Sequence, residues 1–185
     1  MDRLKHVLGK IFAELALIVG AAAIAVGVGM YSLPAGLISG GVLLIGGGVG
    51  LPPMIGLCRQ LLAEGKQPTV LAGFNTESEV FLRDAVEAMG AAFVLATMDG
   101  SAGVKGLVTD AMADLDFTDV CACGPLPMLK AIMNATDKPA QLSFEERMGC
   151  GFGACMGCTV KVKGGYKRIC KDGPILDRDE VIWEA

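Results

Sequence analysis

The sequence predicts an α/β protein in which a doubly wound parallel sheet is followed by a small cysteine-bearing module. Two observations predict this arrangement. Between residues 41 and 139, short apolar runs alternate four times with segments of helical spacing, which is typical of a parallel sheet covered by helices. Residues 140–185 then bring four cysteines and many glycines close together. We therefore expect three parts: an apolar segment of undefined structure over residues 1–40, an α/β domain over 41–139 and the module over 140–185.

The alternation begins with a continuous apolar run, Val42–Ile45, as expected for a strand that is buried on both faces. A glycine-rich turn follows, and apolar residues at helical spacing then continue from Ile55 to Leu62. The later elements repeat this order: strand 69–73, helix 77–89, strand 92–97, helix 107–114, strand 119–122 and a helix to about residue 134.

The turn after the first strand is a candidate nucleotide site, which would comprise Gly46, Gly47, Gly48, Gly50 and Pro52. Glycines at the carboxyl end of a parallel strand let a pyrophosphate approach backbone N–H groups, and the following helix N-terminus favours negative charge. The match to the dinucleotide-binding pattern is incomplete, since a leucine replaces the third glycine. The alternative is a tight turn between strand and helix.

A second candidate, Cys123-Gly124-Pro125, ends the fourth strand at the same edge of the sheet. A thiol there could face a nicotinamide ring, and the alternative is a small buried cysteine. Asp99 follows the third strand and is included as a cofactor-binding residue. Because no cluster of arginines follows the second or third strand, the sequence favours NAD(H) over NADP(H).

Four cysteines of the C-terminal module are candidate metal ligands: Cys150, Cys155, Cys158 and Cys170. The first three have the spacing C-x4-C-x2-C, by which plant-type ferredoxins hold three thiolates of a [2Fe–2S] cluster. The residues between them are mostly small, which lets a loop wrap closely around an inorganic core and point N–H groups at its sulfurs. The spacing therefore predicts a one-electron carrier.

Zinc and disulfide bonds are the alternatives. Structural zinc sites usually consist of two separate cysteine pairs, whereas this sequence has three cysteines close together and one distant. Seven cysteines is an odd number for a disulfide framework. Two short strands flanking Gly164-Gly165 predict a hairpin that would return Cys170 to the other three cysteines. Basic residues of the module could offset the charge of a cluster, dock an acidic partner or form a solvated face.

The overall charge argues against a nucleic-acid partner. The chain of 185 residues has a formal net charge of −4, and only 5% of its residues are aromatic. The single histidine, His6, lies near the N-terminus, so a reaction that needs a histidine base is not expected.

Residues 11–30 are almost wholly apolar, and about 20 apolar residues can span a bilayer. Glu14 within this run and its alanine-rich and glycine-rich composition favour a buried or interfacial helix instead, in a cytoplasmic protein.

From about residue 30 to the end, the sequence resembles the electron-transfer subunit of bacterial class 1B dihydroorotate dehydrogenase, within the ferredoxin-reductase-like superfamily. The shared motifs are YSLPAGLISGG, VLLIGGGVGLPPM, DGSAGVKGLVTD, ACGPLPMLK and SFEERMGCGFGACMGCTVKVKGGYKRICKDGPILDRDEVIW. The last motif is specific to that family, whereas the glycine and Cys-Gly-Pro motifs are shared more widely with ferredoxin reductases.

The resemblance implies a hetero-oligomer with a dihydroorotate-oxidising flavoprotein, working in pyrimidine biosynthesis. Electrons would pass through the [2Fe–2S] cluster to FAD and then to NAD+. The four cysteines would hold the cluster, and the glycine turn and Cys123–Pro125 would face the nicotinamide cofactor. Members of the family also carry an N-terminal flavin-binding β-barrel, for which the residues before Gly41 have neither the length nor the motif. Another chain would then supply the flavin half, or FAD would bind only weakly to what remains, or the chain would be a truncated gene product.

Overall fold

The computed structural model describes residues 41–183, which lie within one compact unit. The expectations for residues 1–40, including a membrane span over 11–30, fall outside the described residues. Within residues 41–183, no helix is both long enough and apolar enough to cross a membrane.

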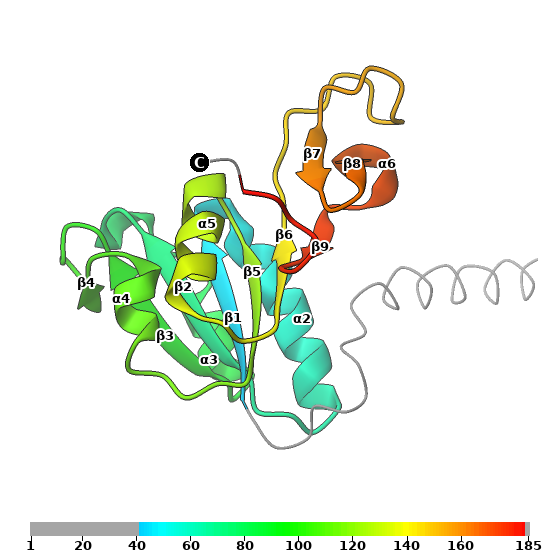
Figure 1. The fold of residues 1–185 in the computed structure, drawn as a ribbon. Coiled ribbons are helices and arrows are strands. Elements are labelled where there is room, and N and C mark those ends of the chain that lie inside the picture. The colour runs from blue at the N-terminus through cyan, green and yellow to red at the C-terminus, as the bar shows by residue number, and fades with distance from the viewer. Residues whose placement is uncertain (1–40, 184–185) are drawn as a thin grey trace, which may run out of the picture. The chain divides into compact units, whose positions relative to one another are not determined.

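A seven-stranded sheet forms the centre of the unit, in the order β4-β3-β2-β1-β5-β6-β9 (Figure 1). Its strands are β1 (Val42–Gly47), β2 (Thr69–Phe74), β3 (Ala92–Thr97), β4 (Val104–Lys105), β5 (Asp119–Cys123), β6 (Ala140–Ser143) and β9 (Ile175–Asp177). All neighbours pair in parallel except β6 and β9, which are antiparallel. From β1 the chain adds strands first on one side and then on the other, so the order reverses between β1 and β5. This confirms the predicted doubly wound sheet.

Helices cover both faces of the sheet. The helical segments are η1 (Gly48–Gly50), α2 (Leu51–Ala63), η2 (Glu77–Glu79), α3 (Arg83–Ala88), α4 (Val108–Met112), α5 (Leu126–Ala135) and α6 (Ile169–Asp172). Figure 1 shows α4 and α5 on one face of the sheet and α2 and α3 on the other. This separation is what right-handed crossovers in opposite directions from β1 produce.

The core explains why β1 reads as an unbroken apolar run. All six of its residues are buried, as in a central strand covered on both faces. Leu43 and Ile45 pack in a cluster with residues of α4 and α5, including Leu129 and Ile132. Leu44 has no exposed surface and points to the opposite face, because successive side chains of a strand alternate.

The predicted helix over residues 77–89 is wrong in its first half. The segment forms the short η2, a stretch without helix, and then α3. The Glu79 carboxylate accepts hydrogen bonds from the Asn75 backbone N–H and side-chain amide. These bonds keep η2 from continuing into α3 as one longer helix. Leu82 then takes a left-handed conformation, with φ of +62°, immediately before α3. The preceding Phe81 packs edge-on against Phe74 at 5.4 Å between ring centroids, which supports this bend.

The C-terminal residues leave the sheet and return to it. After β6 a long loop leads to a hairpin of β7 (Thr159–Val162) and β8 (Gly165–Arg168), then to α6 and back to β9 (Figure 1). The hairpin turn is Lys163-Gly164, one residue earlier than expected, since Val162 pairs with Gly165. Because β6 and β9 both belong to the main sheet, the sheet continues past residue 140, and the domain boundary there stays a prediction.

Candidate functional site

Two turns meet at the carboxyl ends of β1 and β5, where the strand order reverses. Gly50, at the end of the first turn, lies directly against the backbone of Cys123: a Cβ at Gly50 would be 2.1 Å from the Cys123 carbonyl oxygen. Only glycine permits this approach, since real Cβ atoms essentially never come within 3.0 Å of another atom. The two sequence motifs therefore form one continuous surface, which is the usual ligand position in a doubly wound sheet.

Met128, in the first turn of α5, packs beneath both turns. A Cβ at Gly47 would lie 2.5 Å from its sulfur, and one at Gly124 would lie 2.6 Å from its terminal methyl carbon. Gly124 also has a φ of +155°, which L side chains rarely adopt. The end of the methionine side chain therefore packs against both turns, a contact that the sequence alone did not predict.

A pocket of about 450 Å³ opens at this edge of the sheet. Its walls come from the turn after β1, the end of β2, the loop before α4 and the start of α5. Glu145, just after β6, completes them. Representative lining residues are Gly47, Gly48, Asn75, Leu107, Met128 and Glu145. Its size and mainly apolar walls suit part of a dinucleotide, for which concave sites of this order are typical.

The predicted nucleotide residues divide into three groups. Gly47, Gly48 and Pro125 line the pocket. Gly46 and Cys123 lie at the ends of β1 and β5, and Gly50 and Gly124 lie in the turns that follow these strands. Gly46 and Gly50 leave no room for a side chain. Pro52 is exposed in the first turn of α2, and neither it nor Asp99 lines the pocket.

Asp99 instead organises the turn after β3. Its carboxylate accepts hydrogen bonds from the Ser101 hydroxyl at 2.6 Å and the Ser101 backbone N–H at 2.9 Å, which lower the pKa of Asp99. The Ser101 hydroxyl oxygen in turn accepts a hydrogen bond from the Glu77 backbone N–H at 2.8 Å. Asp99 thereby links the ends of β2 and β3, and its contact with a cofactor stays a prediction.

Cys123 is buried behind the pocket, with 3% of its surface exposed. Burial raises the pKa of this thiol above its ordinary value, and the nearby Glu145 carboxylate raises it further. The Cys123 sulfur lies 4.0 Å from Glu145 Oε1. The thiol is therefore neutral at physiological pH, and its acidic neighbour Glu145 lines the pocket. Sequence reasoning missed Glu145, although it follows a strand of the sheet at the same edge.

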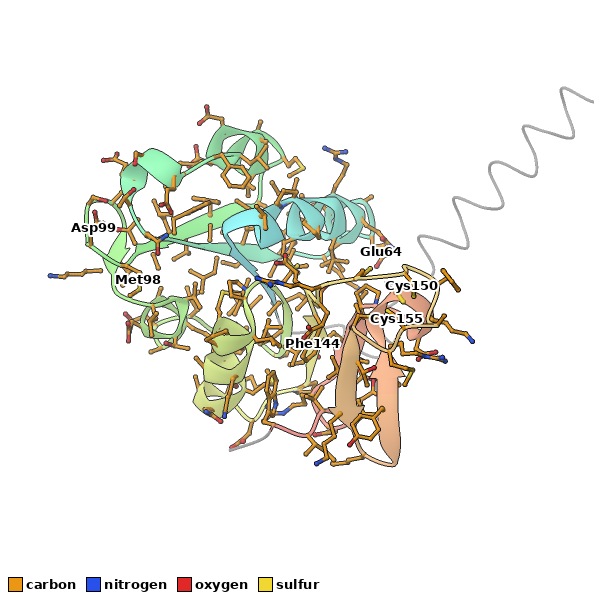
Figure 2. The ribbon with its side chains drawn as sticks, turned by 90° about the horizontal axis from the view of Figure 1, so that it is seen from above. Glu64, Met98, Asp99, Phe144, Cys150 and Cys155 are labelled. Carbon is orange, nitrogen blue, oxygen red and sulfur yellow. The ribbon has the colours of Figure 1, made fainter. Side chains whose placement is uncertain are left out.

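The loop after β6 presents backbone N–H groups to its cysteines. The Cys150 sulfur accepts hydrogen bonds from the N–H of Ala154 at 3.2 Å and of Cys155 at 3.4 Å. The Cys155 sulfur accepts one from Gly157 at 3.4 Å. Figure 2 shows Cys150 and Cys155 side by side on this loop. Such N–H···S bonds are the interactions by which proteins tune bound iron–sulfur clusters.

The hairpin brings the fourth cysteine to the same place. Cys158 is almost fully buried just before β7, and Cys170 lies in α6 just after β8. The Ile169 N–H donates to the Cys158 carbonyl at 3.0 Å, and the Cys170 N–H donates to the Cys158 sulfur at 3.4 Å. The antiparallel pairing thus explains how a ligand 12 residues away in sequence reaches the loop.

The electrostatic state of these thiols suits metal ligation. Backbone N–H donors lower the pKa of Cys150 to about 6 and that of Cys158 below its ordinary value. The pKa of Cys170 is raised, chiefly by its hydrogen bond to Cys158 and also by the charge of Cys150. Within residues 41–183, no three His, Cys, Asp or Glu side chains gather tightly enough to hold a single metal ion.

The donor set fits an iron–sulfur cluster. Four free thiols, at least two with lowered pKa values, supply the soft thiolate ligands that such clusters need. A Cβ at Gly149 or Gly157 would come within 3.4 Å of the Cys155 sulfur, so glycines keep this sulfur uncrowded. The described residues contain no disulfide, and Cys58 and Cys121 are buried.

Two segments of the chain match known protein families. Residues 44–134 match the oxidoreductase NAD-binding domain, and residues 145–182 match the iron-sulfur cluster binding domain of dihydroorotate dehydrogenase B. The electron transfer subunit of dihydroorotate dehydrogenase B (NAD(+)) from Fusobacterium nucleatum subsp. nucleatum is 43% identical over 141 residues, or 72% of this chain and 54% of the relative. The chain thus combines a segment similar to oxidoreductase NAD-binding domains with one similar to the iron-sulfur cluster binding domain of dihydroorotate dehydrogenase B.

These matches confirm the resemblance inferred from the motifs. The corresponding subunit from Bacillus pumilus is 42% identical over 139 residues, covering 72% of this chain and 54% of its own length. The chain therefore spans about half the length of the curated relatives it matches. An iron–sulfur cluster and a nicotinamide dinucleotide are the groups that its two matched domains are named for.

Solved structures show the same architecture. An NADH-dependent reduced ferredoxin-NADP oxidoreductase, studied for flavin-based electron bifurcation, matches with a TM-score of 0.68 and 33% identity. The match covers 77% of this chain and 54% of that chain. An intact type IV self-sufficient cytochrome P450 monooxygenase matches with a TM-score of 0.52 and 17% identity, over 76% of this chain and 27% of that chain. The second likeness shows the fold alone.

Proposed function

We propose that this chain is an electron-transfer subunit that carries electrons from a dihydroorotate-oxidising flavoprotein, through a [2Fe–2S] cluster, to FAD and NAD+. The observation that carries the proposal is the meeting of two sites in one unit. Glu145 lines the nucleotide pocket, and the loop that starts there reaches the first cluster cysteine only five residues later, at Cys150. One short loop therefore connects the proposed nucleotide site, where two electrons are exchanged, to the proposed cluster site, where one is exchanged.

We assign the cluster to Cys150, Cys155, Cys158 and Cys170, which together supply four thiolates. The cluster accepts and releases single electrons, and a flavin is the cofactor that exchanges such electrons for the hydride of NADH. The residues of this chain would bind and orient the dinucleotide. Gly47 and Gly48 let the dinucleotide approach the backbone, and the neutral Cys123 thiol and Glu145 border the position expected for the nicotinamide.

The proposal includes FAD and a catalytic flavoprotein subunit because the chain resembles the electron transfer subunits of dihydroorotate dehydrogenase B. The relatives' name, an electron transfer subunit, supports a hetero-oligomer with a catalytic partner. The flavin-binding part would come from another chain or from sequence outside the described residues. We also propose a cytoplasmic complex. Removing residues 1–29 would then leave the distribution between membrane and soluble fractions unchanged.

The decisive experiment is chemical analysis of the chain purified without oxygen. We expect two irons and two acid-labile sulfides per chain, as a [2Fe–2S] cluster contains, visible absorbance bands and a paramagnetic signal after reduction. Flavin is measured in the chain alone and with its catalytic partner. One zinc and no iron per chain would refute the proposal in favour of a structural zinc site.

A second candidate is an electron carrier that exchanges electrons with ferredoxin instead of a dihydroorotate-oxidising partner. The likeness to the ferredoxin-NADP oxidoreductase, over 77% of this chain, favours it. The two candidates differ in their electron donor. With the catalytic partner added, dihydroorotate should reduce the cluster under the first proposal. Reduction by ferredoxin alone, and never by dihydroorotate, would support the second.

A further inference from the structure

One peptide group lies between an arginine and a cluster cysteine. Arg168 Nη1 donates a hydrogen bond to the Gly153 carbonyl oxygen at 3.0 Å. The N–H of the same peptide belongs to Ala154 and donates to the Cys150 sulfur at 3.2 Å. Because a peptide group is planar, fixing the direction of its carbonyl also fixes the direction of its N–H. Arg168 therefore controls where this N–H points without touching the sulfur.

Arg168 is itself held in place. The Asp172 carboxylate accepts hydrogen bonds from the Arg168 backbone N–H at 2.8 Å and from its Nε at 3.4 Å. The arginine side chain is 27% exposed, so its position is set mainly by these partners. Arg168 ends β8, two residues before Cys170. Lys171 also packs against the loop, since a Cβ at Gly153 would lie 2.8 Å from Lys171 Cδ.

This arrangement has a predictable effect on the cluster. A cationic donor on a carbonyl polarises the peptide and strengthens the hydrogen bond that its N–H gives. Hydrogen bonds to the ligating sulfurs and nearby positive charge stabilise the reduced cluster, which carries one more negative charge than the oxidised one. Both effects act in the same direction, because each favours the added electron.

We propose that Arg168 is a positioning residue that raises the reduction potential of the cluster by holding the Gly153–Ala154 peptide with its N–H toward Cys150. The inference rests on the proposed function, since it requires a cluster bound to the four cysteines. It goes beyond that function by naming a residue outside the ligand set that sets the potential. Lys167, its neighbour, pairs with Glu180 at 2.5 Å and provides a matched control.

The test is a redox titration of the full-length chain with dithionite, followed by visible absorbance and the paramagnetic signal. R168Q should retain its iron and shift the midpoint potential to a more negative value. R168K keeps the positive charge but loses the guanidinium, which donates to both Gly153 and Asp172. Its midpoint potential should therefore also shift to a more negative value, by less than in R168Q. K167Q removes a charge from the same hairpin and should have the wild-type potential.

A second variant keeps the proposal testable if R168Q loses its cluster. R168K is that variant: it keeps the positive charge and loses the guanidinium, so where its cluster is retained its potential should still be more negative than that of the wild type. A wild-type potential in R168Q, or in R168K where R168Q has lost its cluster, would overturn the inference while the proposed function stands. Wild-type protein without iron would instead refute the proposed function itself.

Discussion

Gly50 is the residue on which the nucleotide pocket most depends, since it lies directly against the Cys123 carbonyl. In G50A the added methyl group must push the two turns apart, and overpacking of this kind costs about 1–3 kcal/mol. We expect NADH to bind at least about tenfold more weakly, which corresponds to about 1.4 kcal/mol. The dissociation constant is measured by titration of NADH fluorescence.

The control for this substitution is G56A. Gly56 lies in α2, the helix that begins directly after Gly50, with nothing within 4 Å of its Cβ position. Alanine there should leave binding unchanged and stabilise the helix by up to about 1 kcal/mol. Equal NADH affinity in both variants would contradict the assigned pocket.

Cys155 is the most exposed of the four proposed ligands. In C155S one thiolate is lost, and a serine hydroxyl is a poor ligand for an iron–sulfur cluster, so we expect most of the iron and the visible absorbance to be lost. C58A is the control, because Cys58 is buried in α2 and should not affect iron content. Full iron content in C155S would show that the ligand assignment is wrong.

The thiols of the cluster-free protein should differ in reactivity with pH. Thiolates are the reactive form, and the pKa of Cys150 is about 6, whereas burial raises that of Cys121 to about 12. Alkylation of Cys150 by iodoacetamide should therefore be half-maximal near pH 6 and slow as the pH falls further. Cys121 should stay unmodified at neutral pH. Peptide mass spectrometry distinguishes the two sites, and equal labelling at pH 7 would contradict these environments.

The proposed cluster ligands could be recognised from sequence because their spacing and their neighbours are local properties of the chain. Glu145 and Met128 could not, since both gain their positions from the pairing of strands distant in sequence. The cofactor contact of Asp99 stays a prediction. Asp99 lies at the expected edge of the sheet, but its carboxylate is taken up by Ser101.

At the scale of elements, Arg178 joins the end of α5 to the segment after β9. Its guanidinium donates to the Thr136 carbonyl at 2.6 Å, the Lys138 carbonyl at 2.8 Å and the Met133 carbonyl at 3.4 Å. R178A leaves three carbonyls without this donor, and charged hydrogen bonds contribute about 1.5–3 kcal/mol, so we expect a free energy of unfolding lower by about 2 kcal/mol. Urea denaturation measures this change.

R83A provides the comparison. Arg83 pairs with Glu87 on the surface of α3, where both side chains are about half exposed. Exposed pairs of this kind contribute about 0.3–0.5 kcal/mol, so the denaturation midpoint should hardly move. Similar losses in the two variants would show that Arg178 does not tie these elements together.

The strands β1, β2, β3 and β5 could be located from sequence because buried parallel strands are continuous apolar runs. The edge strands β4 and β9 were missed, since they are only two and three residues long and their pairing depends on distant neighbours. The broken helix around η2 was missed because a side chain, that of Glu79, competes with helical hydrogen bonding.

For the whole molecule, the choice of dinucleotide follows from the charges near the ends of β2 and β3. Glu77, Glu79 and Asp99 lie there, and a 2′-phosphate would be repelled by these carboxylates. We expect NADH to bind at least about tenfold more tightly than NADPH, compared by the same fluorescence titration and at two ionic strengths. Tighter binding of NADPH would contradict this expectation.

The return of the chain from β6 to the neighbouring antiparallel β9 has a consequence for how fast the protein can work. The segment between β6 and β9 bears the four cysteines, and both of its ends are anchored side by side in one sheet. The separation between the proposed cluster site and the proposed nucleotide site is therefore set by the fold. Electron tunnelling over a fixed gap needs no swinging arm. Adding glycerol or sucrose to raise solvent viscosity should therefore leave the internal transfer rate unchanged.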